Sequence, residues 1–239
     1  MSDLHLFCDR SCADEHLDQI VTAADSSDLL VLGGDIFDFK WSRHGSRSDS
    51  IVAARNWLHD LVIHADDCQF CYLLGNHDCG EDFVSELQSL CDQFPQLDWK
   101  AYFFRLGSTV FLHGDVIDCK PSSQAQLEKS RHAWSSESPK GSLLNTAYNA
   151  IVACRIHRVV AQCLNTNTKI ANSLLPYLED INQGPASGTS QVVFGHTHWA
   201  TQFVSDDVQF RNGGAALHGL PFTILNLKIE VDQGFEFNR

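Results

Sequence analysis

Short apolar runs alternate with segments of helical periodicity through the first half of the chain. Leu17, Ile20, Val21 and Ala24 recur at the i, i+3, i+4 and i+7 spacing that is typical of an amphipathic helix. The full pattern predicts a helix over 14–26, a strand over 29–32, a helix over 51–62, a strand over 70–74 and a helix over 83–90. Because strands and helices alternate, we expect an α/β sheet with parallel strands.

The pattern changes in the second half of the chain. Two short apolar segments flank Leu106-Gly107-Ser108, which predicts a hairpin over 102–105 and 109–112. Helical stripes then cover 144–160 and 170–181, with Pro176 as a kink, inside an insertion that spans about 119–188. Further strands are predicted at 192–194, 199–204, 208–211 and 222–231. We interpret residues 1–239 as a single α/β domain that carries a helical insertion.

Composition and charge exclude several classes of protein. The 239 residues include 17 Lys and Arg against 30 Asp and Glu, a net charge of −13, which is opposite to the balance of a nucleic-acid-binding protein. The longest unbroken apolar runs have only five residues, too few for a transmembrane helix. The N-terminus has no basic region followed by an apolar stretch, so we expect a cytoplasmic protein.

Ionisable and amide side chains follow the predicted strands at their carboxyl ends. Leu-Val-Leu-Gly-Gly leads into Asp35, with Asp38 three residues later, and Tyr-Leu-Leu-Gly leads into Asn76-His77-Asp78. Two further strands lead into His113 and into His196-Thr-His198, and Asp3-Leu-His5 offers the same groups near the N-terminus. In open α/β sheets ligands bind outside the carboxyl ends of strands, so we expect these side chains to share one edge.

This series of motifs resembles the calcineurin-like metallophosphoesterase family. The family pattern is Asp-x-His, Gly-Asp-x-x-Asp, Gly-Asn-His-Asp/Glu, a His usually followed by Gly, and Gly-His-x-His, and every block is present between residues 3 and 198. The resemblance implies a β-sandwich of two mixed sheets flanked by helices, with two divalent metals at one edge. It implies that Asp35 bridges the metals and that His77 is the catalytic histidine, its ring oriented by Asp78. The remaining implied ligands are Asp3, His5 and His198 for the first metal, and Asn76, His113 and His196 for the second.

The donor set agrees with that implication on chemical grounds. Asp, His and Asn without thiolate suit Mn, Fe or Zn, and manganese is our expectation. Two carboxylates on two dications leave a site of about +2, which favours a phosphate ester, and two metals can clamp phosphoryl oxygens. We therefore expect a phosphohydrolase that cleaves a phosphodiester or pyrophosphate. The alternatives are a nuclease or general phosphodiesterase of the same fold, and a non-catalytic scaffold that binds proteins.

The substrate is suggested by a second resemblance and by the charge distribution. Gly-Asp-Ile-Phe-Asp-Phe, followed by a basic loop and a later helical insert, is similar to the UDP-2,3-diacylglucosamine hydrolase branch. Residues 119–170 hold seven basic and two acidic side chains, so this segment carries +5 and the rest of the chain −18. We expect an anionic phosphoester substrate, bound in part by Arg43, Arg155 and Arg158, with peripheral contact to the inner face of the membrane. The basic side chains could instead form a solvated helix face, and the apolar stripe of the insert either packs on the core or lines an acyl-chain groove.

The first motif differs from the others because no apolar strand precedes it. Asp3-Leu-His5 follows only Met1 and Ser2, and two residues span about 7 Å, less than a buried strand needs. We therefore expect that the natural protein starts further upstream and that the 239-residue chain binds the first metal weakly.

Overall fold

The computed structural model describes residues 1–135 and 165–230. The predicted helical stripe over 144–160 and the predicted ligands Arg155 and Arg158 lie outside these described residues. The sequence prediction of a two-sheet α/β fold flanked by helices is confirmed. The assignment of the whole chain to one domain stays a prediction.

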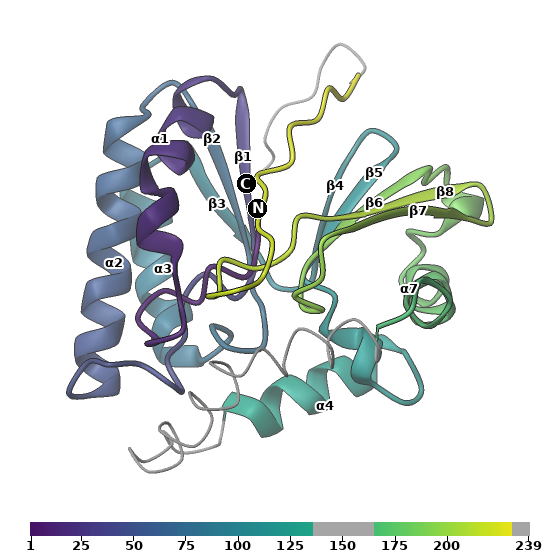
Figure 1. Ribbon diagram of the computed structural model, residues 1–239, viewed down its shortest axis with the longest axis horizontal. Helices are drawn as coiled ribbons and strands as arrows, with labels where there is room; N and C mark the ends of the chain where they lie inside the picture. Colours follow the sequence, from purple (N-terminus) through teal and green to yellow (C-terminus); the bar gives the residue numbers. More distant parts are fainter. Residues whose placement is uncertain (136–164, 231–239) are drawn as a thin grey trace.

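The first sheet has three parallel strands in the order β1-β2-β3. They are β1 (Leu29–Gly33), β2 (Gln69–Leu73) and β3 (Leu97–Lys100), with Leu30 opposite Phe70 and Phe70 opposite Leu97. A 3-10 turn, Ala13–His16, precedes α1 (Leu17–Asp25), and α2 (Arg47–His64) and α3 (Glu81–Gln93) follow β1 and β2. Figure 1 shows the three helices on one side of this sheet.

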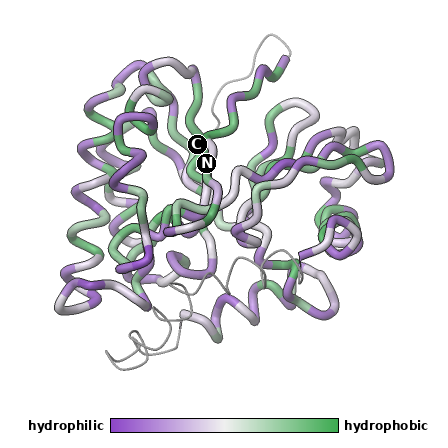
Figure 2. Tube along the Cα trace, in the orientation of Figure 1, coloured by the Kyte–Doolittle hydropathy of each residue, from purple (hydrophilic) through white to green (hydrophobic). Residues whose placement is uncertain are grey.

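The predicted apolar stripes supply most of the buried faces of these helices, although Leu17 of α1 is 44% exposed. In α2 the buried apolar residues are Ile51, Ala54, Leu58, Leu61 and Val62, the positions that carry the helical period in the sequence. Hydrophilic and hydrophobic residues alternate along the turns of α1, α2 and α3 in Figure 2. Burial of these stripes against the sheet stabilises the layer, at about 25 cal/mol per Å² of apolar surface removed from water.

The second sheet is mixed and has the order β4-β5-β6-β8-β7. Its strands are β4 (Phe103–Leu106), β5 (Thr109–Leu112), β6 (Gln191–Phe194), β7 (Thr201–Ser205) and β8 (Val208–Asn212). The hairpins β4–β5 and β7–β8 are antiparallel, whereas β5–β6 and β6–β8 are parallel. The helix α7 (Asn167–Asp180) packs Ile170, Leu174 and Tyr177 in one buried cluster with Val110 and Phe210.

A smaller apolar cluster joins the two sheets. Leu73 of the first sheet, and Phe104 and Phe111 of the second, are buried together, with Leu227 and Ile229 packed against them. Figure 1 shows the segment that contains Leu227 and Ile229 passing between the sheets. The arrangement is a sandwich whose sheets face each other, with α1–α3 outside the first sheet and α7 outside the second.

The structure corrects the predicted strand over 222–231 in its described part. Residues 222–230 form only an isolated bridge between Gly214 and Phe222, with no regular ladder. The alternation of apolar residues in this segment serves packing between the sheets, because Leu227 and Ile229 join the cluster described above. Sequence reasoning also missed β3, since Leu97 is its only buried residue and a single apolar position gives no period.

Two helices occupy the described ends of the predicted insertion, α4 (Gln124–Ser135) and α7, and a 3-10 turn, η2 (Asp115–Asp118), precedes them. Among the described residues, no helix is long and apolar enough to cross a membrane. At the N-terminus, Met1 O accepts from Gly33 N and His5 N donates to Asp35 O, so residues 1–5 lie along β1 and the turn after it. The hypothesis about residues upstream of Met1 stays a prediction.

Candidate metal centre

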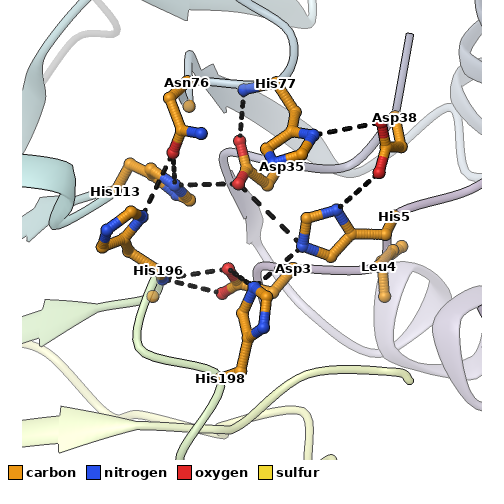
Figure 3. Close-up of polar contacts among 12 residues, drawn as sticks. Asp3, Leu4, His5, Asp35, Asp38, Asn76, His77, His113, His196 and His198 are labelled. Carbon is orange, nitrogen blue, oxygen red and sulfur yellow. Dashed lines mark hydrogen bonds and ion pairs between the residues drawn. The ribbon is translucent and has the colours of Figure 1, made fainter. Parts of the chain in front are cut away.

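The strand ends converge as the sequence predicts. Asp35 follows β1, Asn76 follows β2, His113 follows β5 and His196 follows β6. Figure 3 shows these side chains directed toward one another, together with Asp3 and His5 from the N-terminal segment. The carboxyl ends of parallel strands meet at one edge, so residues far apart in sequence reach a common point.

Four side chains form a first group in which one ligand atom from each residue lies within 4.8 Å of the others: Asp3, His5, Asp35 and His198. Within it, Nε2 of His5 lies 2.9 Å from Nε2 of His198, which in turn lies 3.6 Å from Asp3 Oδ1. Asp3, His5 and Asp35 are almost wholly buried. These donors match the ligands that the resemblance implies for the first metal.

A second group, by the same criterion, contains Asp35, His113 and His196. Nε2 of His113 lies 3.2 Å from Asp35 Oδ2, and Asn76 Oδ1 lies 3.3 Å from His113 Nε2 and 3.1 Å from His196 Nδ1. Nδ1 of His113 faces the carbonyl of Gly33 at 3.1 Å. When the ring is neutral, this contact places its proton on Nδ1 and leaves the lone pair of Nε2 free to coordinate a cation. Asp35 belongs to both groups and can bridge two ions.

The electrostatics of the two groups fit cations. Burial raises the pKa of Asp3, and the neighbouring carboxylate of Asp35 raises it further. Burial would also raise the pKa of Asp35, but the imidazoles of His113, His77 and His5 hold it well below its usual range. Burial, together with His5, lowers the pKa of His198 and keeps that ring neutral, as a metal ligand must be. Burial would lower the pKa of His113, but Asp35 and Asp3 raise it to about 10 in the metal-free protein, so a cation bound here must displace a proton from this ring. The carboxylate oxygens and imidazole nitrogens together form a donor set that suits two divalent ions.

The backbone at these positions is strained. Five proposed ligands have left-handed φ angles between 47° and 64°, namely Asp3, His5, Asp35, His196 and His198. Such conformations cost of order 1–3 kcal/mol each and persist only where the surrounding structure holds them. Backbone bonds such as Asp3 N to Gly34 O at 3.0 Å provide that restraint, so the strain aims the side chains inward.

The glycines of the motifs have a steric role. A Cβ at Gly75 would overlap Asp35 Oδ1, and a Cβ at Gly195 would overlap Asp3 Oδ2. The Gly-Asn and Gly-His steps therefore let the backbone pass next to the carboxylates. In addition, the amide of His196 donates to both oxygens of Asp3, at 2.9 and 3.1 Å.

The structure corrects the predicted partner of His77. Nδ1 of His77 lies 3.0 Å from Oδ1 of Asp38, whereas the oxygens of Asp78 accept from Ile36 N, Gly75 N and the Tyr72 hydroxyl. The prediction that Asp78 orients the ring is wrong, because its carboxylate is directed into the strand ends and braces them. Burial opposes protonation of His77, but Asp38 and Asp35 raise its pKa to about 9 in the metal-free protein.

Other residues at the centre were missed by sequence reasoning. The indole of Trp134 on α4 lies 5.1 Å from the His77 ring, and Nζ of Lys40 lies 3.7 Å from the Trp134 ring centroid. Asp118 faces His196 at 3.0 Å. Of these residues, only Lys40 carried a sequence signal, as the first of the basic side chains after the Gly-Asp-x-x-Asp motif.

The predicted substrate ligand Arg43 pairs with a surface carboxylate, and its contact with a substrate stays a prediction. Its guanidinium lies 3.5 Å from Asp14 Oδ2, and the side chain is half exposed. The neighbouring Arg47 pairs with Asp82 on the surface, with Nε 2.6 Å from Oδ2. The basic side chains after Asp38 therefore have different surroundings: Lys40 contacts Trp134, whereas both arginines pair with surface carboxylates.

Comparison with known proteins agrees with this geometry. The sequence profile described as calcineurin-like phosphoesterase matches residues 1–200, which include all the proposed ligands. The chain is similar to a solved phosphopantetheinyl hydrolase (PptH) from Mycobacterium tuberculosis at 16% identity, covering 90% of this chain and 88% of that one, with a TM-score of 0.41. That likeness is too weak to carry an argument about substrate. A search of the curated proteins gave no match. Because the profile covers most of the sequence, the chain belongs to the calcineurin-like phosphoesterase family and is a metal-dependent phosphoester hydrolase.

Proposed function

We propose that this enzyme uses two divalent ions to cleave a phosphodiester or pyrophosphate bond. The observation that carries the proposal is the position of Asp35, whose carboxylate lies in both ligand groups. Two cations held there would supply a nucleophile at neutral pH and withdraw charge from the phosphoryl oxygens. In this proposal Asp3, His5, Asp35 and His198 hold one ion, and Asp35, Asn76, His113 and His196 hold the other.

His77 has a separate role in the proposal, because the groups that bind the ions do not need it. Its amide donates to Asp35 Oδ1 at 2.8 Å, and its Nδ1 faces Asp38. This leaves Nε2 to give a proton to, or form a hydrogen bond with, a phosphoryl or leaving oxygen. Manganese is the proposed metal, with iron or zinc as alternatives, because the donors are carboxylate, amide and imidazole.

We further propose an anionic substrate that is linked to a lipid or a nucleotide, such as a UDP-diacylglucosamine-like pyrophosphate. The support is the charge of +5 over residues 119–170 in a chain of −13. A cytoplasmic location with peripheral contact to the inner face of the membrane belongs to this proposal. A nuclease is less favoured by the net charge. A non-catalytic scaffold is less favoured because every ligand of the family motifs is present.

Metal-free protein reconstituted with Mn²⁺, Fe²⁺ or Zn²⁺ provides the test. At saturating metal we expect two bound ions per chain, the first bound more weakly, and hydrolysis of bis-(p-nitrophenyl) phosphate, with binding and hydrolysis both abolished in Asp35→Ala. Asp82→Asn, which alters a surface carboxylate, serves as the control. A panel of nucleotide sugars, lipid pyrophosphates and DNA then separates the substrate classes. Two ions without turnover on any of these esters would support the scaffold instead.

A further inference from the structure

The two ring nitrogens of His196 face different partners. Nδ1 lies 3.1 Å from Asn76 Oδ1, on the side of the second ligand group, and Nε2 lies 3.0 Å from Asp118 Oδ2. A neutral imidazole carries one N–H, and a carboxylate accepts but does not donate. Asp118 therefore places the proton on Nε2 and leaves the lone pair of Nδ1 directed at the metal position.

This arrangement differs from that of the other imidazole in the second group. The proton-bearing nitrogen of His113 faces the main-chain carbonyl of Gly33, a buried partner that no side-chain substitution removes. The partner of His196 is a side chain at the rim of the site, since the Asp118 side chain is 63% exposed. The orientation of the His196 ring thus depends on the contacts that fix the carboxylate of Asp118.

Asp118 is held from the far side by Lys169. The ammonium of Lys169, in the first turn of α7, lies 3.2 Å from Asp118 Oδ1, so the two oxygens of Asp118 serve His196 and Lys169 separately. Asp118 is also the last residue of η2, whose first residue, Asp115, forms a buried two-point ion pair with Arg131 of α4 at 2.7 and 2.9 Å. The turn that carries Asp118 is thereby fixed to α4 at one end and to α7 at the other.

We propose that Asp118 is a positioning residue for His196, and that Lys169 fixes its carboxylate so that α7 influences the second metal site. The inference rests on the proposed two-metal function, but it concerns affinity at one site and not the reaction. A carboxylate behind a ligating histidine orients the ring and raises its basicity, and its loss usually costs 10–100-fold in metal affinity. The pair with Lys169 is exposed and adds little to folding stability, so its contribution is to geometry.

The test is titration of metal-free protein with Mn²⁺ by calorimetry, and with Co²⁺ by visible absorption, which reports coordination at each site. We expect Asp118→Ala to weaken the second site by about 10–100-fold and to leave the first unchanged. Asp118→Asn should lose less, because its amide oxygen still accepts from Nε2. Lys169→Met should lose less than Asp118→Ala. Asp82→Asn, which removes a surface carboxylate that pairs with Arg47, should match the wild type.

Two comparisons separate positioning from a general charge effect. Asp118→Asn and Asp118→Ala lose the same charge, so equal losses in both variants would overturn the positioning role. In a His196→Ala background, Asp118→Ala should weaken the second site no further, and an undiminished additional loss would also overturn it. Denaturant midpoints of the metal-free variants should equal that of the wild type. A wild-type protein that binds no second ion would refute the two-metal function itself, which is a different result from an Asp118 variant that binds two ions normally.

Discussion

The ring of His77 is held by Asp38, whose Oδ1 lies 3.0 Å from Nδ1 and whose carboxylate is completely buried. Asp38 stands three residues after Asp35, so a single strand end supplies both the shared carboxylate and the partner of the histidine. Backbone amides of Lys40 and Trp41 donate to Asp38 Oδ1, and Arg10 Nη2 lies 3.6 Å from Oδ2. Contacts other than the one with His77 therefore fix the Asp38 carboxylate in the position from which it orients the ring.

This pair predicts the behaviour of two variants. His77→Ala should keep both ions and lose about 10²–10⁴ in rate, the range for a positioned acid or base. Asp38→Asn should lose less and should shift the basic limb of the pH–rate profile to lower pH, because Asp38 raises the pKa of His77. Steady-state rates across pH, with metal content measured on the same samples, provide the check. Wild-type turnover by metal-loaded His77→Ala would contradict the assigned role.

Asp78 should behave as a structural residue. Its oxygens accept from two amides and the Tyr72 hydroxyl at 2.6 to 2.9 Å, and it is wholly buried. Asp78→Asn places an NH₂ group against these donors and should cost about 1–3 kcal/mol in the free energy of unfolding. The rate of the metal-loaded variant should remain near that of the wild type. A large rate loss at unchanged stability would restore a catalytic role for Asp78.

Asp35 and His198 should differ in the number of ions they affect. Asp35 lies in both ligand groups, so Asp35→Ala should bind neither ion tightly. His198 lies only in the first group, so His198→Ala should retain the second ion. Metal analysis after gel filtration measures the stoichiometry. Full two-ion occupancy in Asp35→Ala would exclude the bridging position.

The ion pair between Arg131 and Asp115 should contribute strongly to stability. Arg131→Met leaves Asp115 buried without its partner, and such a loss costs about 3–5 kcal/mol. In the Arg131→Met background, Asp115→Asn should recover part of the lost free energy of unfolding, because it removes the unpaired buried charge. Burial would raise the pKa of Asp115, but Arg131 lowers it overall, so the pair stabilises the fold above about pH 4 and less as the pH falls. Denaturant unfolding between pH 3 and 7 should show a weaker acid dependence in the Arg131→Met variant.

Trp134 should support His77 from α4. Trp134→Ala removes the ring whose centroid lies 5.1 Å from that of the His77 imidazole. An aromatic contact of this kind contributes about 0.5–1.5 kcal/mol, so we expect roughly a 2- to 10-fold loss in kcat/KM. Trp134→Phe keeps an aromatic ring and should lose less. Equal losses in both variants would indicate that the indole itself, and not an aromatic surface, is required.

The amphipathic period was a reliable guide where burial is regular. The five apolar positions that predict a helix over 51–62 are the buried apolar positions of α2, because a helix facing a sheet buries one stripe. The same reasoning failed for residues 222–230, where alternating apolar residues pack between two sheets without a ladder. Periodicity reports which side chains are buried, and it does not report where the backbone hydrogen bonds go.

The sequence by itself determined which chemical groups stand at each strand end, because a short apolar run followed by Asp, Asn or His is a local pattern. The tertiary structure decided how these groups pair. Asp78 is adjacent to His77 in sequence, yet the turn after β2 directs its carboxylate to Tyr72 and leaves the imidazole to Asp38, 39 positions earlier. Asp118 and Lys169 belong to no motif. Asp118 reaches His196, and Lys169 reaches Asp118, only because η2 and α7 pack beside the second sheet. Contacts across such separations depend on the packing of whole elements, which no local pattern encodes.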